Sequence, residues 1–260
     1  MTIEEFSNEF DVLASSYFIE GGFTISDSSL LAFNEYEKSL FLTKAEEQYA
    51  LSLYNGKNSS GDSFEKTEEM RRYLHNLVAE YYTEDPIGAD ETNYLDKPYH
   101  GVNSSFKSTF FKLPDDLWFI TYESVKTTED SSKERCDGKL SIVQDVIPVT
   151  QDEFHRIKRN PFRGPSYRRA LRLDLSDTSK ENGVVEIVSK YDIGSYYVRY
   201  IKKLEPIILV DLPKPLSISR KTKACGCKLH EATHKDILEL AVRLAIASRP
   251  LNNTSKKDND

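Results

Sequence analysis

The apolar residues of this chain repeat with a helical period near both ends and with a strand period in the middle. Between Ile3 and Tyr17 they lie three or four positions apart, which places them along one face of a helix. Gly21-Gly22 and Asn55-Gly56 are typical helix stops, and Thr150 is a typical N-cap. These signals predict helices over residues 3–20, 26–54, 62–82, 151–159 and 230–248.

The middle of the chain is rich in β-branched and aromatic residues that alternate with polar ones. Predicted strands cover 106–113, 117–126, 139–147, 168–175, 184–190 and 194–210. The stretch 83–114 is otherwise rich in Gly, Pro, Asp and Asn, which favours an irregular connection. The sequence therefore predicts an α+β protein with an N-terminal helical hairpin or arm at 1–85, a β-rich central domain at 86–250 that includes the C-terminal helix, and a disordered tail at 251–260.

Composition narrows the function classes. A chain of 260 residues is long enough for a real hydrophobic core, and its net charge of −7 argues against a general nucleic-acid binder. Three cysteines, Cys136, Cys225 and Cys227, offer no plausible disulfide framework, which suits synthesis in a reducing compartment. No signal peptide and no apolar run of transmembrane length is found in the sequence. We expect a protein made in a cytosol, without membrane insertion.

One motif looks catalytic. His230, Glu231 and His234 match H-E-x-x-H, in which two histidines bind zinc and the glutamate activates water, so a zinc-dependent hydrolase is one alternative. Gly226 just upstream predicts that the helix begins only at the motif, and Glu239 is the only glutamate that follows it. The context therefore favours a structural role, with no catalytic residue and no cofactor.

A structural metal site is the second alternative for the same segment. Four side chains with zinc-binding chemistry lie close together in the sequence. They are Cys225, Cys227, His230 and His234. The C-x-C spacing is less usual than C-x-x-C, and all four side chains would have to converge. We favour the interpretation that the histidines simply cover the first turn of the helix.

A basic stretch over residues 155–173 stands out in an otherwise acidic chain. Its basic side chains are Arg156, Lys158, Arg159, Arg163, Arg168, Arg169 and Arg172. They are candidates to face DNA phosphates or an acidic surface on a neighbouring subunit, and a solvated loop is the third alternative. Asn160-Pro161 and Gly164-Pro165 predict a structured turn.

Four groups of segments follow one another over about 8 to 248. They are EYEKSLFLTKAEEQYALSLYNG with FEKTEEMRRYL, KLPDDLWFITYE with VIPVTQDEFHRIKRNPFRGP, YYVRYIKKLEPIILVDLP, and CKLHEATHKDILELAVRLA. In this order they resemble segments of virion structural proteins of crAss-like, short-tailed bacteriophages. Proteins of this kind are head–tail connector, adaptor or ring components that stack below the portal.

This resemblance implies a structural role rather than an enzymatic one. It implies a homo-oligomeric ring, usually twelvefold, that contacts the portal protein and neighbouring tail or ring proteins while genomic DNA passes through the lumen. It also implies that the protein is made in the bacterial host cytoplasm and resides in the virion at the head–tail junction. A DNA-binding packaging accessory protein that uses the basic stretch is the remaining alternative.

Overall fold

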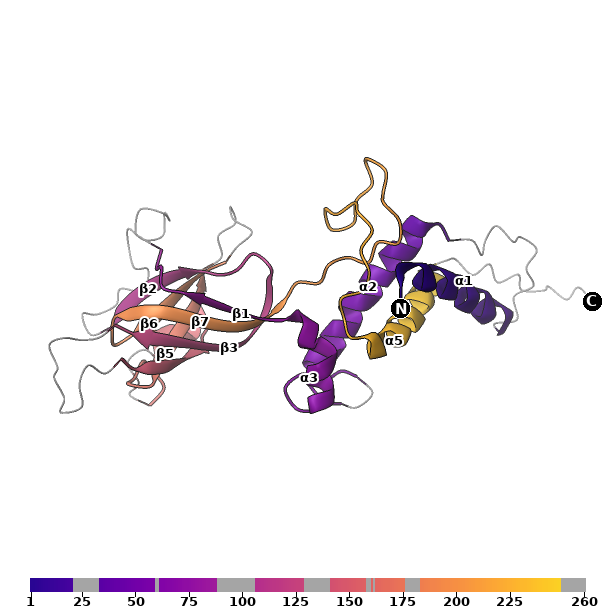
Figure 1. The fold of residues 1–260 in the computed structure, drawn as a ribbon. Helices are drawn as coiled ribbons and strands as arrows, with labels where there is room; N and C mark the ends of the chain where they lie inside the picture. The colour runs from indigo at the N-terminus through magenta and orange to yellow at the C-terminus, as the bar shows by residue number, and fades with distance from the viewer. Residues whose placement is uncertain are drawn as a thin grey trace, which may run out of the picture. The chain divides into compact units, whose positions relative to one another are not determined.

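A computed structural model shows that the chain forms two compact units. The structure describes residues 1–20, 33–58, 61–87, 106–128, 141–157, 160, 162–175 and 183–248. One unit is Met1–Leu77 with Leu204–Asp260, and the other is Val78–Lys203. The first is helical and the second is a β-sheet with one short helix, so the α+β class is confirmed (Figure 1).

The helical unit combines the N-terminal helices with the last described helix of the chain. Its elements are α1 (Ile3–Glu20), α2 (Glu35–Asn55), α3 (Glu68–Leu74), the 3-10 turns η2 (His75–Leu77) and η4 (Glu231–Thr233), and α5 (His234–Ser248). Phe6 and Phe10 of α1 are fully buried, as are Ile237 and Ala241 of α5. Because α5 packs on α1 and α2, the C-terminal helix belongs with the N-terminal helices, whereas the sequence placed it in the β-rich domain.

Helix α2 begins later than the sequence suggested. The predicted start at Ser26–Ser29 lies outside the described residues, and Asn34 is the N-cap. Asn34 Oδ1 accepts a hydrogen bond from Glu37 N at 2.8 Å, and Glu37 Oε2 accepts one from Asn34 N at 3.0 Å, which forms a capping box. The predicted stop is confirmed, since Gly56 ends α2 with a φ of 71°.

The predicted helix over 62–82 is wrong at both ends. Helix α3 covers only Glu68–Leu74, and its N-cap is Thr67 rather than Asp62. After the turn η2, Val78–Thr83 form strand β1, in which exposed and half-buried residues alternate. The apolar residues of this segment fit a helical repeat as well as a strand repeat. Pairing with a strand far along the chain makes the segment part of the sheet.

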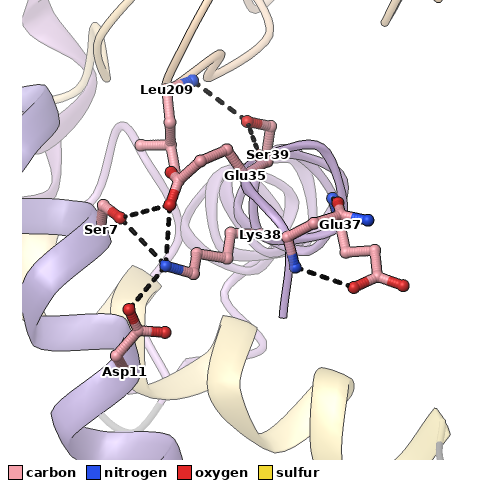
Figure 2. A network of polar contacts seen from close by, with 8 residues as sticks. Ser7, Asp11, Glu35, Glu37, Lys38, Ser39 and Leu209 are labelled. Atoms are coloured by element: carbon pink, nitrogen blue, oxygen red, sulfur yellow. Dashed lines mark hydrogen bonds and ion pairs between the residues drawn. The ribbon is translucent and has the colours of Figure 1, made fainter. Parts of the chain in front are cut away.

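The segment after the last strand packs along α2 as an extended chain. The predicted strand 194–210 ends at Lys202, and Pro206 in this region has no N–H to donate to a ladder. Thr43 Oγ1 accepts a hydrogen bond from Ile207 N at 3.1 Å, and Ser39 Oγ accepts one from Leu209 N at 3.0 Å. Hydroxyls one helical turn apart on α2 thus bind alternate amides of the segment, and Figure 2 shows the bond between Ser39 and Leu209.

A buried lysine joins α1 to α2. Lys38 of α2 is only 3% exposed. Its Nζ donates to Asp11 Oδ2 at 2.7 Å, to Glu35 Oε1 at 2.9 Å and to Ser7 Oγ at 3.0 Å (Figure 2). Two carboxylates and a hydroxyl therefore use all three donors of the ammonium group, which compensates for its burial.

The β unit is built on one seven-stranded sheet. Its strands are β1 (Val78–Thr83), β2 (Lys107–Lys112), β3 (Leu117–Thr127), β4 (Val143–Pro148), β5 (Arg169–Leu175), β6 (Val184–Ser189) and β7 (Ile193–Lys202). Their order in the sheet is β1-β7-β3-β4-β5-β6-β2. All neighbours are antiparallel except β4 and β5, which are parallel and joined through α4 (Gln151–Ile157).

The sheet curls around its core. Just beyond β1, Ile87 N donates to Phe110 O of β2 at 2.8 Å, so the chain from one edge strand reaches the other edge. The enclosed face is filled by side chains such as Phe111 and Tyr196, while Leu171 and Leu173 point to the opposite face and pack under α4. Curling gives this unit a core on the enclosed face and a second, smaller one beneath α4 (Figure 1).

Candidate functional site

The HEATH segment starts a helix instead of lying inside one. His230 is the N-cap of the turn η4, with an extended backbone, and its Nδ1 accepts a hydrogen bond from Ala232 N at 3.2 Å. Helix α5 begins only at His234. An H-E-x-x-H zinc site needs both histidines on one face of a continuous helix, so this geometry gives the hydrolase alternative no support.

His234 is a packing residue. It is 4% exposed, and its ring lies 5.4 Å from the ring of Phe6. Nε2 lies 3.2 Å from Leu229 O, which can only accept, so we assign the proton to Nε2. Nδ1 then accepts from the Met1 amino group at 2.9 Å, and burial lowers the pKa of His234 below its usual value. Both ring nitrogens are engaged: Nδ1 ties the N-terminus to α5, and Nε2 holds the segment just before α5.

The two cysteines of the candidate metal site face different partners. Cys225 Sγ lies 3.5 Å from Glu205 Oε2, and Cys227 Sγ lies 3.2 Å from Glu46 Oε1. Burial raises the pKa of Cys227, so the thiol stays protonated and donates to the carboxylate. In the part of the chain that the structure describes, no group of three or more His, Cys, Asp or Glu side chains is arranged to hold a metal ion.

Glu46 is a buried acid that the sequence analysis missed. It is fully buried in α2, and Oε1 accepts hydrogen bonds from the Cys227 thiol and, at 3.4 Å, from Lys228 N. Oε2 is also buried and meets no hydrogen-bond donor among the described residues. Burial raises the pKa of Glu46 to about 7. Glu46 lies on the buried face of α2 with Leu42 and Leu53. A glutamate at this position of the helical repeat was the feature of the sequence that could have identified a buried acid.

The basic stretch divides into exposed and buried arginines. Arg156, Arg163 and Arg168 are exposed, and Arg169 is half-buried. Arg163 Nη2 lies 3.1 Å from Glu153 Oε1 of α4, and Arg169 Nη1 donates to Phe162 O at 2.6 Å. Two further candidates, Lys158 and Arg159, lie outside the described residues.

Arg172 is the exception, because it lies inside the β unit. It is only 9% exposed and donates through Nη1 to Glu123 Oε1, while its Nε lies 3.0 Å from Asp174 Oδ1. Tyr196 OH donates to the other oxygen of Glu123 at 2.6 Å, and burial raises the pKa of this phenol. Arg172 is thus used by the fold and is not presented to a partner as the sequence suggested.

An exposed aromatic ring lies among the exposed arginines. Phe162 is 85% exposed and Tyr167 is 41% exposed, both in the loop between α4 and β5. This loop is held in place: Asn160 Oδ1 accepts from Phe162 N at 2.9 Å, and Asn160 O accepts from Gly164 N at 2.7 Å. The predicted turn is confirmed, and it presents an aromatic and arginine surface, which is typical of protein interfaces.

Among the described residues, no helix is both long and apolar enough to cross a membrane.

Comparison with known proteins identifies the family. The profile described as phage tail ring protein 3/4 matches residues 1–257. Ring protein 3 of Bacteroides phage crAss001 is 43% identical over 250 residues, which is 96% of each chain. Ring protein 4/5 of the same phage is 26% identical over 254 residues, covering 95% of this chain and 93% of the relative. The chain therefore belongs to the phage tail ring protein 3/4 family and is a structural ring protein of a crAss-like bacteriophage virion.

Proposed function

We propose that this chain forms a homo-oligomeric, twelvefold ring at the head–tail junction, between the portal and the tail. The observation that carries the proposal is the match to the ring protein family over nearly the whole chain. Two separately compact units support it, because a ring subunit needs distinct surfaces for neighbours beside, above and below it. In this proposal genomic DNA passes through the lumen, and the chain is a non-enzymatic part of the conduit.

The test is assembly of the purified chain alone and together with the portal ring of the same phage. Mass photometry would reveal ring-sized species, and electron microscopy would count the copies. Discrete rings, or assembly that depends on the portal, would support the proposal. A chain that remains monomeric with and without the portal would contradict it.

We also propose that the loop between α4 and β5 contacts a protein neighbour in the virion rather than DNA. An exposed phenylalanine gains little from phosphates but gains much from burial in a protein interface. Arg163 and Arg168 flank it and supply charge for an acidic partner surface. Phe162→Ser should leave the free chain folded, because Phe162 is 85% exposed, and should weaken ring or portal assembly. Unchanged assembly in Phe162→Ser would show that the loop faces solvent in the virion.

A further inference from the structure

The chain carries a second basic surface, which the sequence analysis did not identify. The segment between β7 and α5 leaves the helices of its own unit and returns, and it is drawn in orange in Figure 1. Its outer part, residues 211–224, is called the basic arm here. The basic arm contains Lys214, Arg220, Lys221 and Lys223 but only one acid, Asp211, in a chain whose net charge is −7.

Backbone hydrogen bonds hold the basic arm in a defined conformation. Leu212 N donates to Thr222 O at 2.7 Å, and Ile218 and Lys221 exchange two backbone hydrogen bonds at 3.0 and 2.8 Å. Between them, Ser219 and Arg220 have φ values of 47° and 63°, the left-handed conformation of a tight two-residue hairpin turn. Neither residue is glycine, so the turn carries backbone strain, and strain of this kind concentrates at functional positions.

Within the basic arm, the charged side chains differ in their partners. Lys221 Nζ lies 2.7 Å from Glu205 Oε1 and is used within the unit. Lys214 and Lys223 are exposed, and neither makes an ion pair with any residue that the structure describes. Leu216, 38% exposed, lies between them in the sequence. The arm therefore presents two available ammonium groups and an apolar side chain.

The outer face of α1 has the opposite character. Every charged residue of α1 is acidic. Glu4, Glu5, Glu9 and Val12 are exposed and lie on the side of the helix opposite the buried Phe10. Val12 is 67% exposed, so this face also combines carboxylates with one apolar side chain.

We propose that the basic arm of one copy binds the outer face of α1 on the next copy in the ring. This inference rests on the proposed homo-oligomeric ring. Contacts in a ring are head-to-tail, so two different surfaces of identical units must match, and these two match in charge and in their apolar side chain. A polyphosphate partner would match the lysines of the arm but not Leu216, which is why a second copy is favoured over DNA.

Charge reversal tests the contact. The arm variant is Lys214→Glu/Lys223→Glu, and the α1 variant is Glu4→Lys/Glu9→Lys, which leaves Glu5 in its hydrogen bond with Thr2. Lys44→Glu/Lys57→Glu, on α2 and just after its end, is the matched control, since both lysines are exposed and the net charge changes as in the arm variant. Self-association of the full chain is measured by sedimentation at low and high salt, and helix content by circular dichroism.

We expect each reversal alone to weaken self-association about tenfold or more, with little change in the control. A chain that carries both reversals, or an equimolar mixture of the two variants, should regain association, because opposite charges again face each other. Reversals that leave association unchanged would overturn the contact but not the ring. A wild-type chain that does not self-associate either alone or with the portal ring would contradict the homo-oligomeric ring itself, and the contact with it.

DNA is the alternative partner of the basic arm, and the same variants test whether the arm binds it. Binding of a double-stranded oligonucleotide is measured by fluorescence anisotropy. Loss of DNA binding in the arm variant, with self-association unchanged, would assign the arm to DNA and overturn the proposal.

Discussion

The Cys227 thiol lies 3.2 Å from Glu46 Oε1 and links the segment before α5 to the middle of α2. The two residues are far apart in the sequence, and together they place a donor against a fully buried acid. Only one oxygen of that acid is satisfied among the described residues. A carboxyl in such a site favours its neutral form, since burial penalises the charge.

We predict that Glu46 makes the helical unit less stable as pH rises. Burial raises the pKa of folded-state Glu46 to about 7 from its ordinary value of 4.5, so the folded state holds the proton more tightly. The stabilisation is complete below about pH 4.5 and is lost as pH rises to about 7, by an amount on the order of 3 kcal/mol. Urea unfolding of wild type and Glu46→Gln, followed by far-UV circular dichroism at pH 5 and pH 8, measures this change in the free energy of unfolding.

The difference between the two proteins isolates Glu46, because His234 titrates in both. The pKa of His234 is lowered by burial, so its contribution runs in the opposite direction and stability rises with pH. Glu46→Gln cannot ionise and should lack the Glu46 part of the pH dependence. Parallel pH profiles for wild type and Glu46→Gln would show that Glu46 stays ionised in the fold.

The sequence predicted local features better than long-range ones. Strand runs are local patterns, and strands β2 to β7 lie in the predicted runs, although the run 194–210 ends early at Lys202 and the last helix begins at His234 rather than at 230. Strand β1 was missed because its register is set by β7, far along the chain, which no local pattern reveals. Arg168 and Arg172 look alike in the sequence, yet only Arg172 is buried, because Glu123 on β3 lies opposite it. Burial of an ion pair depends on the strand order, which the sequence alone did not provide.

The Lys38 network should hold α1 on α2. Removing the ammonium group with Lys38→Met leaves Asp11 and Glu35 without their shared counter-ion, and we expect a loss of about 2 kcal/mol. Lys66→Met is the matched control, because its pair with Asp62 is a surface pair with the lysine 65% exposed, and it should change stability by less than about 0.5 kcal/mol. Urea unfolding followed by circular dichroism compares them, and equal losses would show that the network contributes no more than a surface pair.

Zinc should have no effect on this protein. His230 Nδ1 caps a backbone amide, and both nitrogens of His234 are engaged. We therefore expect the same melting temperature with added zinc and with a chelator, because the described residues hold no preformed site that would gain binding energy in the folded state. Metal analysis of the purified chain provides the second measurement. One zinc per chain, lost with Cys225→Ser or His234→Asn, would restore the structural metal site as the better interpretation.

The buried ion pair between Arg172 and Glu123 should contribute more to the stability of the β unit than any exposed arginine of the basic stretch. Arg172→Met leaves Glu123 as an uncompensated buried acid, and we expect a loss of about 3 kcal/mol. The double variant Arg172→Met/Glu123→Gln removes both charges, keeps an acceptor for Tyr196 OH and should recover most of the loss. Arg168→Met, at an exposed position of the same stretch, should change stability by less than about 0.5 kcal/mol. Trp118 of β3 is the only tryptophan, so its fluorescence follows unfolding of this unit. If Arg172→Met were as stable as Arg168→Met, Arg172 would again be a candidate for contact with a partner.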